Sequence, residues 1–434
     1  SINGVDRILA PFVRKSYEKY LKAVIEEQKD IYGIEPDMEK AEEVAWKRTR
    51  KEVKDGIQTI QYQINTLMTT NGQAPFVTLF MYFQPDYEYA KEAAMIDEEI
   101  LEQRLQGIKN EQDVYVTPAF PKLIYVLDEH NVHPDSPYYY LTELAAKCTA
   151  KRMYPDYISA KKMREIYEGN VFSPMGCRSF LSPWKNKEGK YVWDGRFNMG
   201  VVSINLPQIG ILARGDEKKF FEILDKRLEL CHKALLLRYD LLKDITSDVS
   251  PIHWQYGAIA RLKKGEKIYP LLQNGYATLS LGYIGIYEAS VLITGESHTT
   301  PEGEKFALKI IHRLRDAVDA WKKESGLGFA LYGTPAESLT NRFCAIDKAR
   351  FGEIKDVTDK GYYTNSYHVD VREPINVFDK FRFEAQFQKV STGGCISYVE
   401  IPNMTNNVEA VLTMVRFIYD NICYGEFNTK SDYC

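Results

Sequence analysis

Short apolar runs alternate with long amphipathic stretches along most of this chain, and this alternation limits the folds that it can adopt. Apolar runs typical of buried strands occupy residues 77–83, 122–127, 201–212 and 328–332. Stretches with apolar residues at helical spacing occupy residues 9–29, 38–68, 87–108 and 305–324, and another opens at Asp216. Strands that alternate with helices need crossover connections, which place parallel strands in one sheet. The pattern therefore predicts an α/β fold, and it leaves open whether the sheet is flat or closed into a barrel.

Several segments indicate where helices begin and what they pack against. The helix that opens at Asp216 has one apolar face, which makes Cys231 a packing residue; the face consists of Phe220, Leu224, Leu228, Cys231 and Leu235. Ser136-Pro137 predicts a helix start, because serine caps a helix and proline suits its first position. Residues 334–337 carry the same signal with Glu337 three residues after Thr334, which is the pattern of a capping box. Residues 275–285 are rich in glycine, which predicts a close approach of the backbone to another group.

The composition excludes several classes of protein. The chain has 434 residues, 44% of them hydrophobic and 27% charged, so it can bury a large core as one α/β unit or two domains. A net charge of −4 without a basic stripe argues against binding to nucleic acid. No apolar run reaches the ~18 to 20 residues of a membrane span, and the first residues do not resemble a signal peptide. Seven cysteines at irregular spacing predict reduced thiols, and the cytoplasm is the expected location.

One of these cysteines, Cys177, lies in a stretch whose residues favour a shaped turn. Gly176 precedes it, and Ser-Pro pairs flank it at residues 173–174 and 182–183. Glycine permits backbone angles that other residues avoid and proline fixes its own, so the stretch predicts a loop that presents a thiol at its tip. A β-rich run follows at residues 194–208, with Asn198 as one of its polar residues.

These two stretches, MGCRSFLSPW and GRFNMGVVSINLPQ, closely resemble the oxygen-sensitive class III ribonucleotide reductases, which are glycyl radical enzymes. Further similar segments extend the resemblance through nearly the whole chain; they are NTLMTTNGQAPF at 65–76, GTPAESLTNRF at 333–343, YYTNSYHV at 362–369 and TGGCISYVEI at 392–401. The resemblance implies the ten-stranded α/β barrel of the reductases and of pyruvate formate-lyase, with a catalytic finger loop. It also implies that residues 1–434 form a single catalytic barrel domain.

The resemblance assigns roles to particular residues. It implies that Cys177 becomes a thiyl radical and takes the 3′-hydrogen of a ribonucleoside triphosphate, and that Asn198 helps to bind formate as the reductant. The substrate phosphates are assigned to the start of the helix after residue 333, at Thr334, Pro335, Ala336, Glu337 and Ser338. The implied partners are dNTP or ATP effectors, a radical S-adenosylmethionine activase and a second copy of the chain in a homodimer. A thioredoxin or glutaredoxin system remains the alternative reductant.

The chain also departs from the family's pattern. The regulatory nucleotide-binding cone and the C-terminal region with the radical glycine and structural zinc are expected to be absent from it. Cys434 matches the first zinc ligand, but one cysteine cannot hold zinc alone. Two alternatives therefore stay open: a non-catalytic nucleotide-binding or regulatory subunit, and a carbon-chain glycyl radical lyase. The lyase family has two adjacent cysteines in its finger loop, whereas Arg178 follows Cys177 here.

Overall fold

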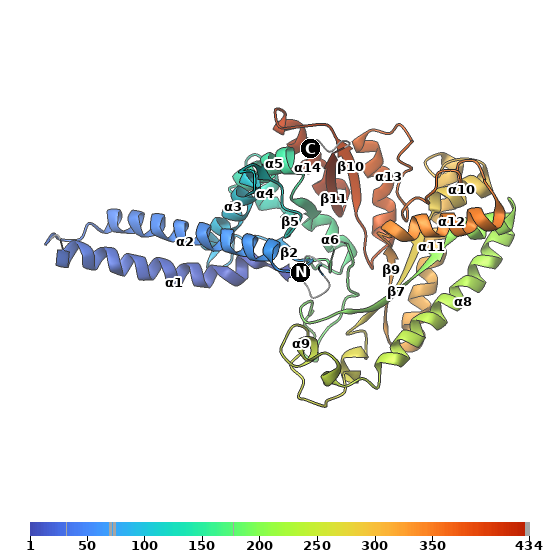
Figure 1. Cartoon of the computed structure of the whole chain (residues 1–434), viewed down its shortest axis with the longest axis horizontal. Helices are drawn as coiled ribbons and strands as arrows, with labels where there is room; N and C mark the ends of the chain where they lie inside the picture. Colours follow the sequence, from blue (N-terminus) through green and yellow to red (C-terminus); the bar gives the residue numbers. More distant parts are fainter. Residues whose placement is uncertain (32, 69–71, 73–74, 177, 430–434) are drawn as a thin grey trace. The chain divides into compact units, whose positions relative to one another are not determined.

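The computed structural model describes residues 1–31, 33–68, 72, 75–176 and 178–429, apart from the side chains of residues 31 and 337. Its contacts divide the chain into two compact units (Figure 1). Unit 1 consists of Ser1–Lys161, Tyr398–Asp420 and Tyr424–Cys434, and unit 2 consists of Lys162–Ser397 and Asn421–Cys423. Both units combine helices with sheets, which confirms the α/β class. The single ten-stranded barrel over residues 1–434 stays a prediction.

Unit 1 is built on a six-stranded sheet with the order β1-β2-β5-β6-β11-β10. The first four strands pair in parallel, and β11 pairs antiparallel with β6. These strands are β1 (Ile2–Asn3), β2 (Thr78–Met81), β5 (Lys122–Leu127), β6 (Asp156–Ser159), β10 (Ser397–Ile401) and β11 (Tyr424–Thr429). β2 and β6 are buried along their whole length, as expected for parallel strands covered on both faces.

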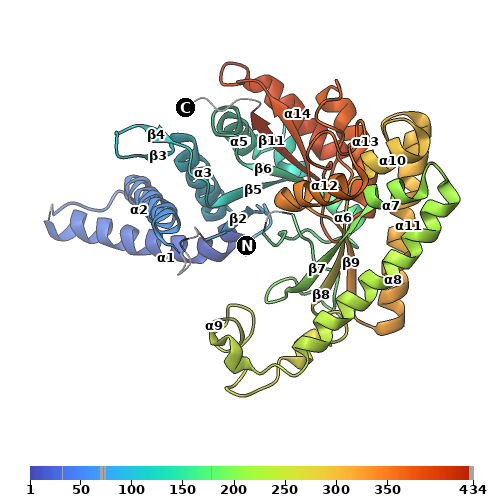
Figure 2. The same ribbon diagram turned by 45° about the vertical axis from the view of Figure 1, so that its right-hand side comes forward.

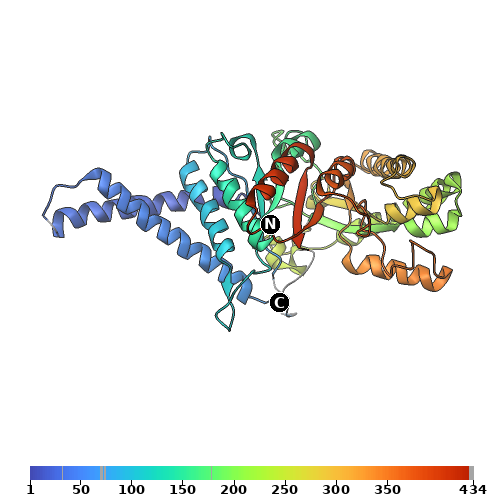
Figure 3. The same ribbon diagram turned by 90° about the horizontal axis from the view of Figure 1, so that it is seen from above.

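The helices of unit 1 include a long pair, α1 (Val5–Glu26) and α2 (Met38–Thr66), which pack side by side (Figures 1 and 3). The rings of Tyr17 and Trp46 stack between them with their centroids 4.0 Å apart. The other elements are α3 (Ala90–Gln106), α4 (Glu129–Val132), α5 (Tyr139–Arg152), α14 (Val408–Asn421), a π-helical turn at Glu27–Ile31 and the hairpin of β3 (Ile108–Lys109) and β4 (Tyr115–Val116). None of the described helices is both long and apolar enough to cross a membrane.

Unit 2 is built on a parallel sheet with the order β7-β8-β9 (Figure 2). Its strands are β7 (Asn198–Asn205), β8 (Thr278–Ile284) and β9 (Gly328–Gly333). Its helices are α6 (Ala160–Ile166), which begins at the boundary with unit 1, α7 (Leu206–Ala213), α8 (Glu217–Leu242), α9 (Pro251–Trp254), α10 (Ile286–Thr294), α11 (Pro301–Ser325), α12 (Glu337–Phe351) and α13 (Val377–Val390). Short 3-10 turns occupy Ser247–Val249 and Tyr269–Leu272.

The helices α8 and α11 pack against the sheet of unit 2, α8 on β7 and α11 on β9. The Asp216 side chain caps α8 by accepting a hydrogen bond from the Lys219 amide, as the sequence predicts. The buried residues of α8 are those of the predicted apolar face, namely Phe220, Leu224, Leu228, Cys231 and Leu235. Cys231 is confirmed as a packing residue, and burial raises the pKa of its thiol to about 11.

The boundaries predicted at Ser136 and within residues 201–212 are wrong. The apolar run 201–212 is not one strand, because β7 ends at Asn205 and α7 begins at Leu206. The Asn205 side chain accepts a hydrogen bond from the Gln208 amide, so it caps a helix inside a run that is apolar enough to look continuous. Ser136 does not cap α5, whose first residue is Tyr139. Its hydroxyl donates to the Glu129 carbonyl 2.7 Å away instead.

Candidate active site

The loop around position 177 is closed by its own backbone. Met175 and Ser179 form an antiparallel bridge, with the Met175 amide donating to the Ser179 carbonyl at 2.7 Å. Gly176 lies in the left-handed region at φ 60°, which agrees with the tight turn predicted here. Cys177 itself lies outside the described residues. The segments on both of its sides thus form a short hairpin that belongs to unit 2.

A strap of two glycines joins this hairpin to the sheet. Ser179 pairs with Gly394, and the Phe180 amide donates to the Gly393 carbonyl at 2.9 Å. On the other side of the strap, the Gly393 amide donates to the Leu331 carbonyl at 2.6 Å, and Gly394 pairs in parallel with Tyr332 of β9. A Cβ atom on Gly394 would collide with the Arg178 carbonyl oxygen and the Tyr332 ring. The backbone of Gly393 and Gly394 therefore lies between the hairpin and the end of β9 and forms hydrogen bonds with both.

Asn198 is the first residue of β7, where the pairing with β8 shifts register. Its Nδ2 donates to the Ser280 hydroxyl at 2.6 Å, and its Oδ1 accepts from the Gly200 amide at 2.7 Å. These contacts fix the plane of the amide. Because Nδ2 carries two hydrogens and Ser280 accepts one, the amide retains a donor for a further acceptor.

The hydroxyls of Ser203 and Thr334 meet over β8 near the carboxyl ends of the strands. Their oxygens lie 3.1 Å apart, and Thr334 is only 7% exposed. Gly282 lies directly beneath them, where a Cβ atom would collide with both hydroxyl oxygens. The close approach predicted for the glycine-rich stretch is thus confirmed, and it brings residues of β7 and of the segment after β9 together at the carboxyl edge of the sheet.

The predicted capping box at this edge is wrong. α12 begins at Glu337 with Ala336 as its N-cap, and no side chain caps it. Thr334 lies two residues too early, because its hydroxyl is held by Ser203 and by the Tyr332 carbonyl 3.4 Å away. Residues 334–336 connect strand and helix without regular structure, and Ser338 lies exposed in the first turn. A helix that starts without a side-chain cap keeps its first N–H groups available for an anion.

A second segment, residues 363–367, crosses the same edge, and no role follows for it from the sequence. Asn365 pairs with Ile284 at the end of β8, and the Ile286 amide donates to the Ser366 carbonyl at 3.2 Å. The Ser366 hydroxyl lies 3.5 Å from where a Cβ atom on Gly333 would be. Asn365 Oδ1 and Ser366 Oγ are both buried without a hydrogen-bond partner among the described residues. The motif YYTNSYHV marks the segment but does not say which of its polar atoms stay unpaired.

Arg178 adds a positive charge to this region. Its Nε and Nη1 are buried and have no hydrogen-bond partner among the described residues. Burial, and to a smaller extent the charge of Arg178, lowers the pKa of His368. A guanidinium group with unpaired donors is suited to bind a carboxylate or a phosphate.

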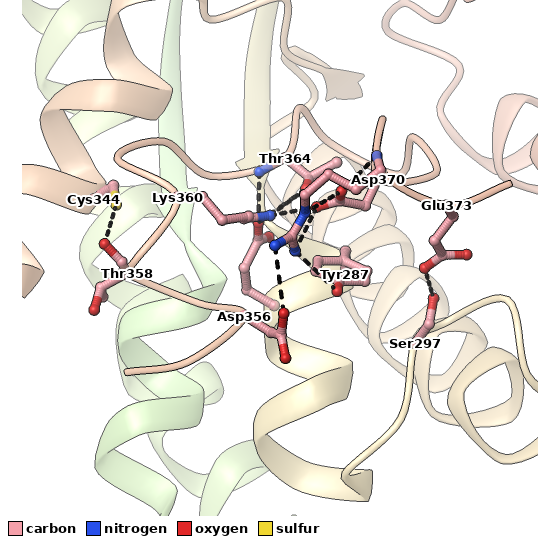
Figure 4. Close-up of polar contacts among 11 residues, drawn as sticks. Tyr287, Ser297, Cys344, Asp356, Thr358, Lys360, Thr364, Asp370 and Glu373 are labelled. Carbon is pink, nitrogen blue, oxygen red and sulfur yellow. Dashed lines mark hydrogen bonds and ion pairs between the residues drawn. The ribbon is translucent and has the colours of Figure 1, made fainter. Parts of the chain in front are cut away.

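The loop before Asn365 is fixed by a buried ion network (Figure 4). Lys360 is 2% exposed and lies 2.6 Å from Glu288 of α10 and 2.5 Å from Asp370. Glu288 also accepts from the amide of Thr364 at 2.8 Å. Burial alone would lower the pKa of Lys360, but its two carboxylate partners raise it above the ordinary value. Arg372 pairs with Asp370 from the other side at 2.9 Å, and hydrogen bonds from Arg372 and Lys360 outweigh burial to bring the pKa of Asp370 down to about 2.

Metal binding has little support among the described residues. They contain no group of three His, Cys, Asp or Glu side chains that could hold a metal ion. Cys434, the predicted zinc ligand, lies outside them. One cysteine does not fit a structural zinc site, which needs four ligands.

The fold of this chain resembles that of known structures. Solved structures of the anaerobic ribonucleotide reductase from Thermotoga maritima resemble this chain with TM-scores of 0.66 (with glycerol in the active site) and 0.64 (in complex with dATP and CTP). These two matches cover 99% and 98% of this chain and 64% and 70% of the solved chains. Their sequences are 18% identical to this one, so the likeness concerns the fold alone.

Sequence comparison then gives the family. The family profile described as anaerobic ribonucleoside-triphosphate reductase matches residues 1–434, and the chain belongs to this family. Relatives with that name include those of Salmonella typhimurium, 42% identical over all of this chain, and of Enterobacteria phage T4, 39% identical over 99% of it. The chain spans 59% of the Salmonella relative and 68% of the phage relative.

Proposed function

We propose that this chain is the catalytic portion of an enzyme that reduces ribonucleoside triphosphates to 2′-deoxyribonucleoside triphosphates without oxygen. The observation that carries the proposal is the family match over the whole chain. The geometry supports it, because the hairpin around position 177 is strapped to the strand end after which α12 begins. A nucleotide with its phosphates at α12 then has its ribose near the hairpin.

In this mechanism Cys177, as a thiyl radical, takes the 3′-hydrogen from the ribose, and the 2′-hydroxyl leaves as water. The glycyl radical of the complete protein supplies the oxidising equivalent when it is present. An S–H bond is weak enough to exchange a hydrogen atom reversibly with carbon, so the thiol can return the hydrogen at the end. Formate is the proposed reductant, and its oxidation to carbon dioxide supplies two electrons.

The phosphates bind, in this proposal, to Thr334, Pro335, Ala336, Glu337 and Ser338. The support is the start of α12, where no side chain caps the first N–H groups. Backbone donors and the positive end of the helix dipole favour an anion at this position. Formate binds near Asn198, whose amide plane is fixed by Ser280 and Gly200 while one N–H remains available.

The partners of the complete protein are proposals as well. They are a radical S-adenosylmethionine activase, nucleotide effectors and a second copy in a homodimer, with structural zinc bound through Cys434 and cysteines from elsewhere. The cytoplasm is the proposed location, since nucleotide precursors are made there. The regulatory subunit and the lyase are not favoured, because the matching family and its named relatives are reductases.

The decisive variant is Cys177→Ala in the full-length protein. We expect turnover to be abolished, while nucleotide binding and the glycyl radical signal persist, because only the thiol that contacts the ribose is removed. Electron paramagnetic resonance of the anaerobically activated protein, together with an assay for deoxyribonucleotide, measures both. Cys231→Ala is the matched control, since this thiol packs in α8. Product formation by Cys177→Ala near the wild-type rate would exclude the proposed role.

The reductant is tested with isotopically labelled formate and the variant Asn198→Ala. We expect carbon dioxide to form in proportion to deoxyribonucleotide, and the variant to raise the KM for formate about tenfold or more. A hydrogen bond to a charged group contributes ~1.5 to 3 kcal/mol, which corresponds to such a factor. If a thioredoxin or glutaredoxin system supports turnover and labelled formate is not consumed, Asn198 has only a structural role.

A further inference from the structure

Asn365 and Ser366 stand at the carboxyl edge of the sheet, and the mechanism above gives them no function. Ser366 is 1% exposed, and its hydroxyl faces Gly333, the residue before the proposed phosphate segment. Asn365 pairs with Ile284, the last residue of the neighbouring strand β8. The two side chains therefore lie beside the start of α12, on a different segment of the chain.

Their unpaired atoms are unusual for a protein interior. Asn365 Oδ1 and Ser366 Oγ are buried and have no partner among the described residues. A buried polar atom without a hydrogen bond costs ~1 to 3 kcal/mol, and nearly all such atoms in folded proteins are paired. Ser366 also has φ 40°, a region that residues other than glycine, asparagine and aspartate seldom adopt. Unpaired polar atoms and a strained backbone at one place are typical of a site that binds a ligand.

The surrounding structure prevents this segment from relaxing. The Tyr363 hydroxyl donates to Asp347 of α12 at 2.9 Å, and the Tyr367 hydroxyl donates to the Ile396 carbonyl at 2.7 Å. The Gly285 amide donates to the Thr364 carbonyl at 3.0 Å, so the segment is also tied to the end of β8. Asn365 and Ser366 are thus held between fixed points on both sides. Their polar atoms are therefore fixed in position, which suits them to form hydrogen bonds with a bound molecule.

The chemistry of the two atoms selects the group that they bind. A carboxamide oxygen only accepts hydrogen bonds, and phosphate oxygens at neutral pH accept them as well, so Asn365 Oδ1 cannot pair with a phosphate. A sugar hydroxyl both donates and accepts, which suits Asn365 Oδ1 and the Ser366 hydroxyl together. We propose that Asn365 and Ser366 bind the ribose hydroxyls of the nucleotide whose phosphates lie at the start of α12. This inference rests on the proposed function and assigns a second segment of the chain to the same site.

The test compares nucleotides that differ only in their ribose hydroxyls. Binding of cytidine triphosphate, its 2′-deoxy and 3′-deoxy analogues and inorganic tripolyphosphate is measured by calorimetry for the wild-type chain, Ser366→Ala and Asn365→Leu. We expect each variant to bind cytidine triphosphate about three- to tenfold more weakly, which is the value of one neutral hydrogen bond. We expect the loss to disappear with the analogue that lacks the contacted hydroxyl, and tripolyphosphate binding to be unchanged. A double-substitution cycle of this kind isolates the contact.

The variant Ser366→Gly separates binding from backbone strain. Glycine tolerates φ 40°, so this variant keeps the fold while it removes the hydroxyl, and it must show the same selective loss as Ser366→Ala. Equal weakening of cytidine triphosphate and both deoxy analogues, or no weakening at all, overturns the inference and leaves the proposed function intact. A wild-type chain that binds neither cytidine triphosphate nor tripolyphosphate overturns the proposed function itself.

Discussion

Lys360 and Ser366 lie six residues apart on one loop of unit 2, but the Lys360 ammonium has partners and the Ser366 hydroxyl has none among the described residues. Lys360 has two carboxylate partners, and Glu288 also holds the Thr364 amide. Asn365 and Ser366, which follow directly, each keep a buried atom with no partner among the described residues. The difference indicates that the first stretch is built to hold the loop in place and the second to meet another molecule. The following predictions test this division.

The largest effect is expected from Lys360→Met, which removes the charge at the centre of the ion network (Figure 4). Glu288 is 0% exposed, and Lys360 is its ion-pair partner, so the variant leaves the Glu288 carboxylate buried and uncompensated while Asp370 keeps Arg372. Breaking a buried ion pair from one side costs ~3 to 5 kcal/mol. Urea denaturation should show a loss of this size. Lys348→Met is the matched control, because the Lys348–Glu353 pair is exposed to solvent and should leave the urea midpoint nearly unchanged.

A smaller effect is expected from Gly282→Ala at the edge of the sheet. The new Cβ atom would collide with the hydroxyl oxygens of Thr334 and Ser203, so one of them must move. Overpacking of this kind costs ~1 to 3 kcal/mol, and displacement of Thr334 should also weaken tripolyphosphate binding. The control is Gly56→Ala in α2, where a Cβ atom meets nothing within 4 Å. This change should stabilise the chain by up to about 1 kcal/mol, since alanine favours a helix over glycine.

The smallest effect concerns a buried acidic pair in unit 1, Asp6 and Asp97, and it depends on pH. Burial raises the pKa of both carboxyls, that of Asp6 to about 6, and the two also repel each other. A carboxyl with a raised pKa in the folded state contributes stability at low pH that is lost as the pH rises through that value. The wild-type midpoint of thermal unfolding should therefore fall between pH 5 and pH 8 more than that of Asp97→Asn. Parallel curves for the two proteins would show that Asp97 is already ionised in the folded protein at pH 5, and would contradict the raised pKa.

The sequence predicted the elements whose signals are local. The face of α8 and its Asp216 cap follow from helical spacing and a capping residue, and the bounds of β5 coincide with the apolar run 122–127. The start of α12 was wrong because Thr334 has a partner 131 residues away, Ser203, that competes for its hydroxyl. A local capping pattern contains no information on such a partner.

The candidate site divides in the same way. The resemblance assigned the motif around Cys177 and the one at residues 333–343 to the site, and both assignments stay predictions. The third part, Asn365 and Ser366, lies within a motif whose letters alone assign no role. Its unpaired atoms become visible only when every neighbouring donor and acceptor is known, because an unmade hydrogen bond is a property of the surroundings and not of the residue.

The glycine strap at residues 393–394 also has a consequence for the order in which the chain matures. The hairpin at residues 175–179 leaves the ribosome long before the strap that fixes it, since about 215 residues separate Ser179 from Gly394. At a synthesis rate of ~5 to 20 residues per second, the hairpin remains without the strap for on the order of 10 to 40 s. A pairing this distant in sequence also forms slowly. The hairpin at residues 175–179 thus reaches its final position only after Gly393 and Gly394 have been made.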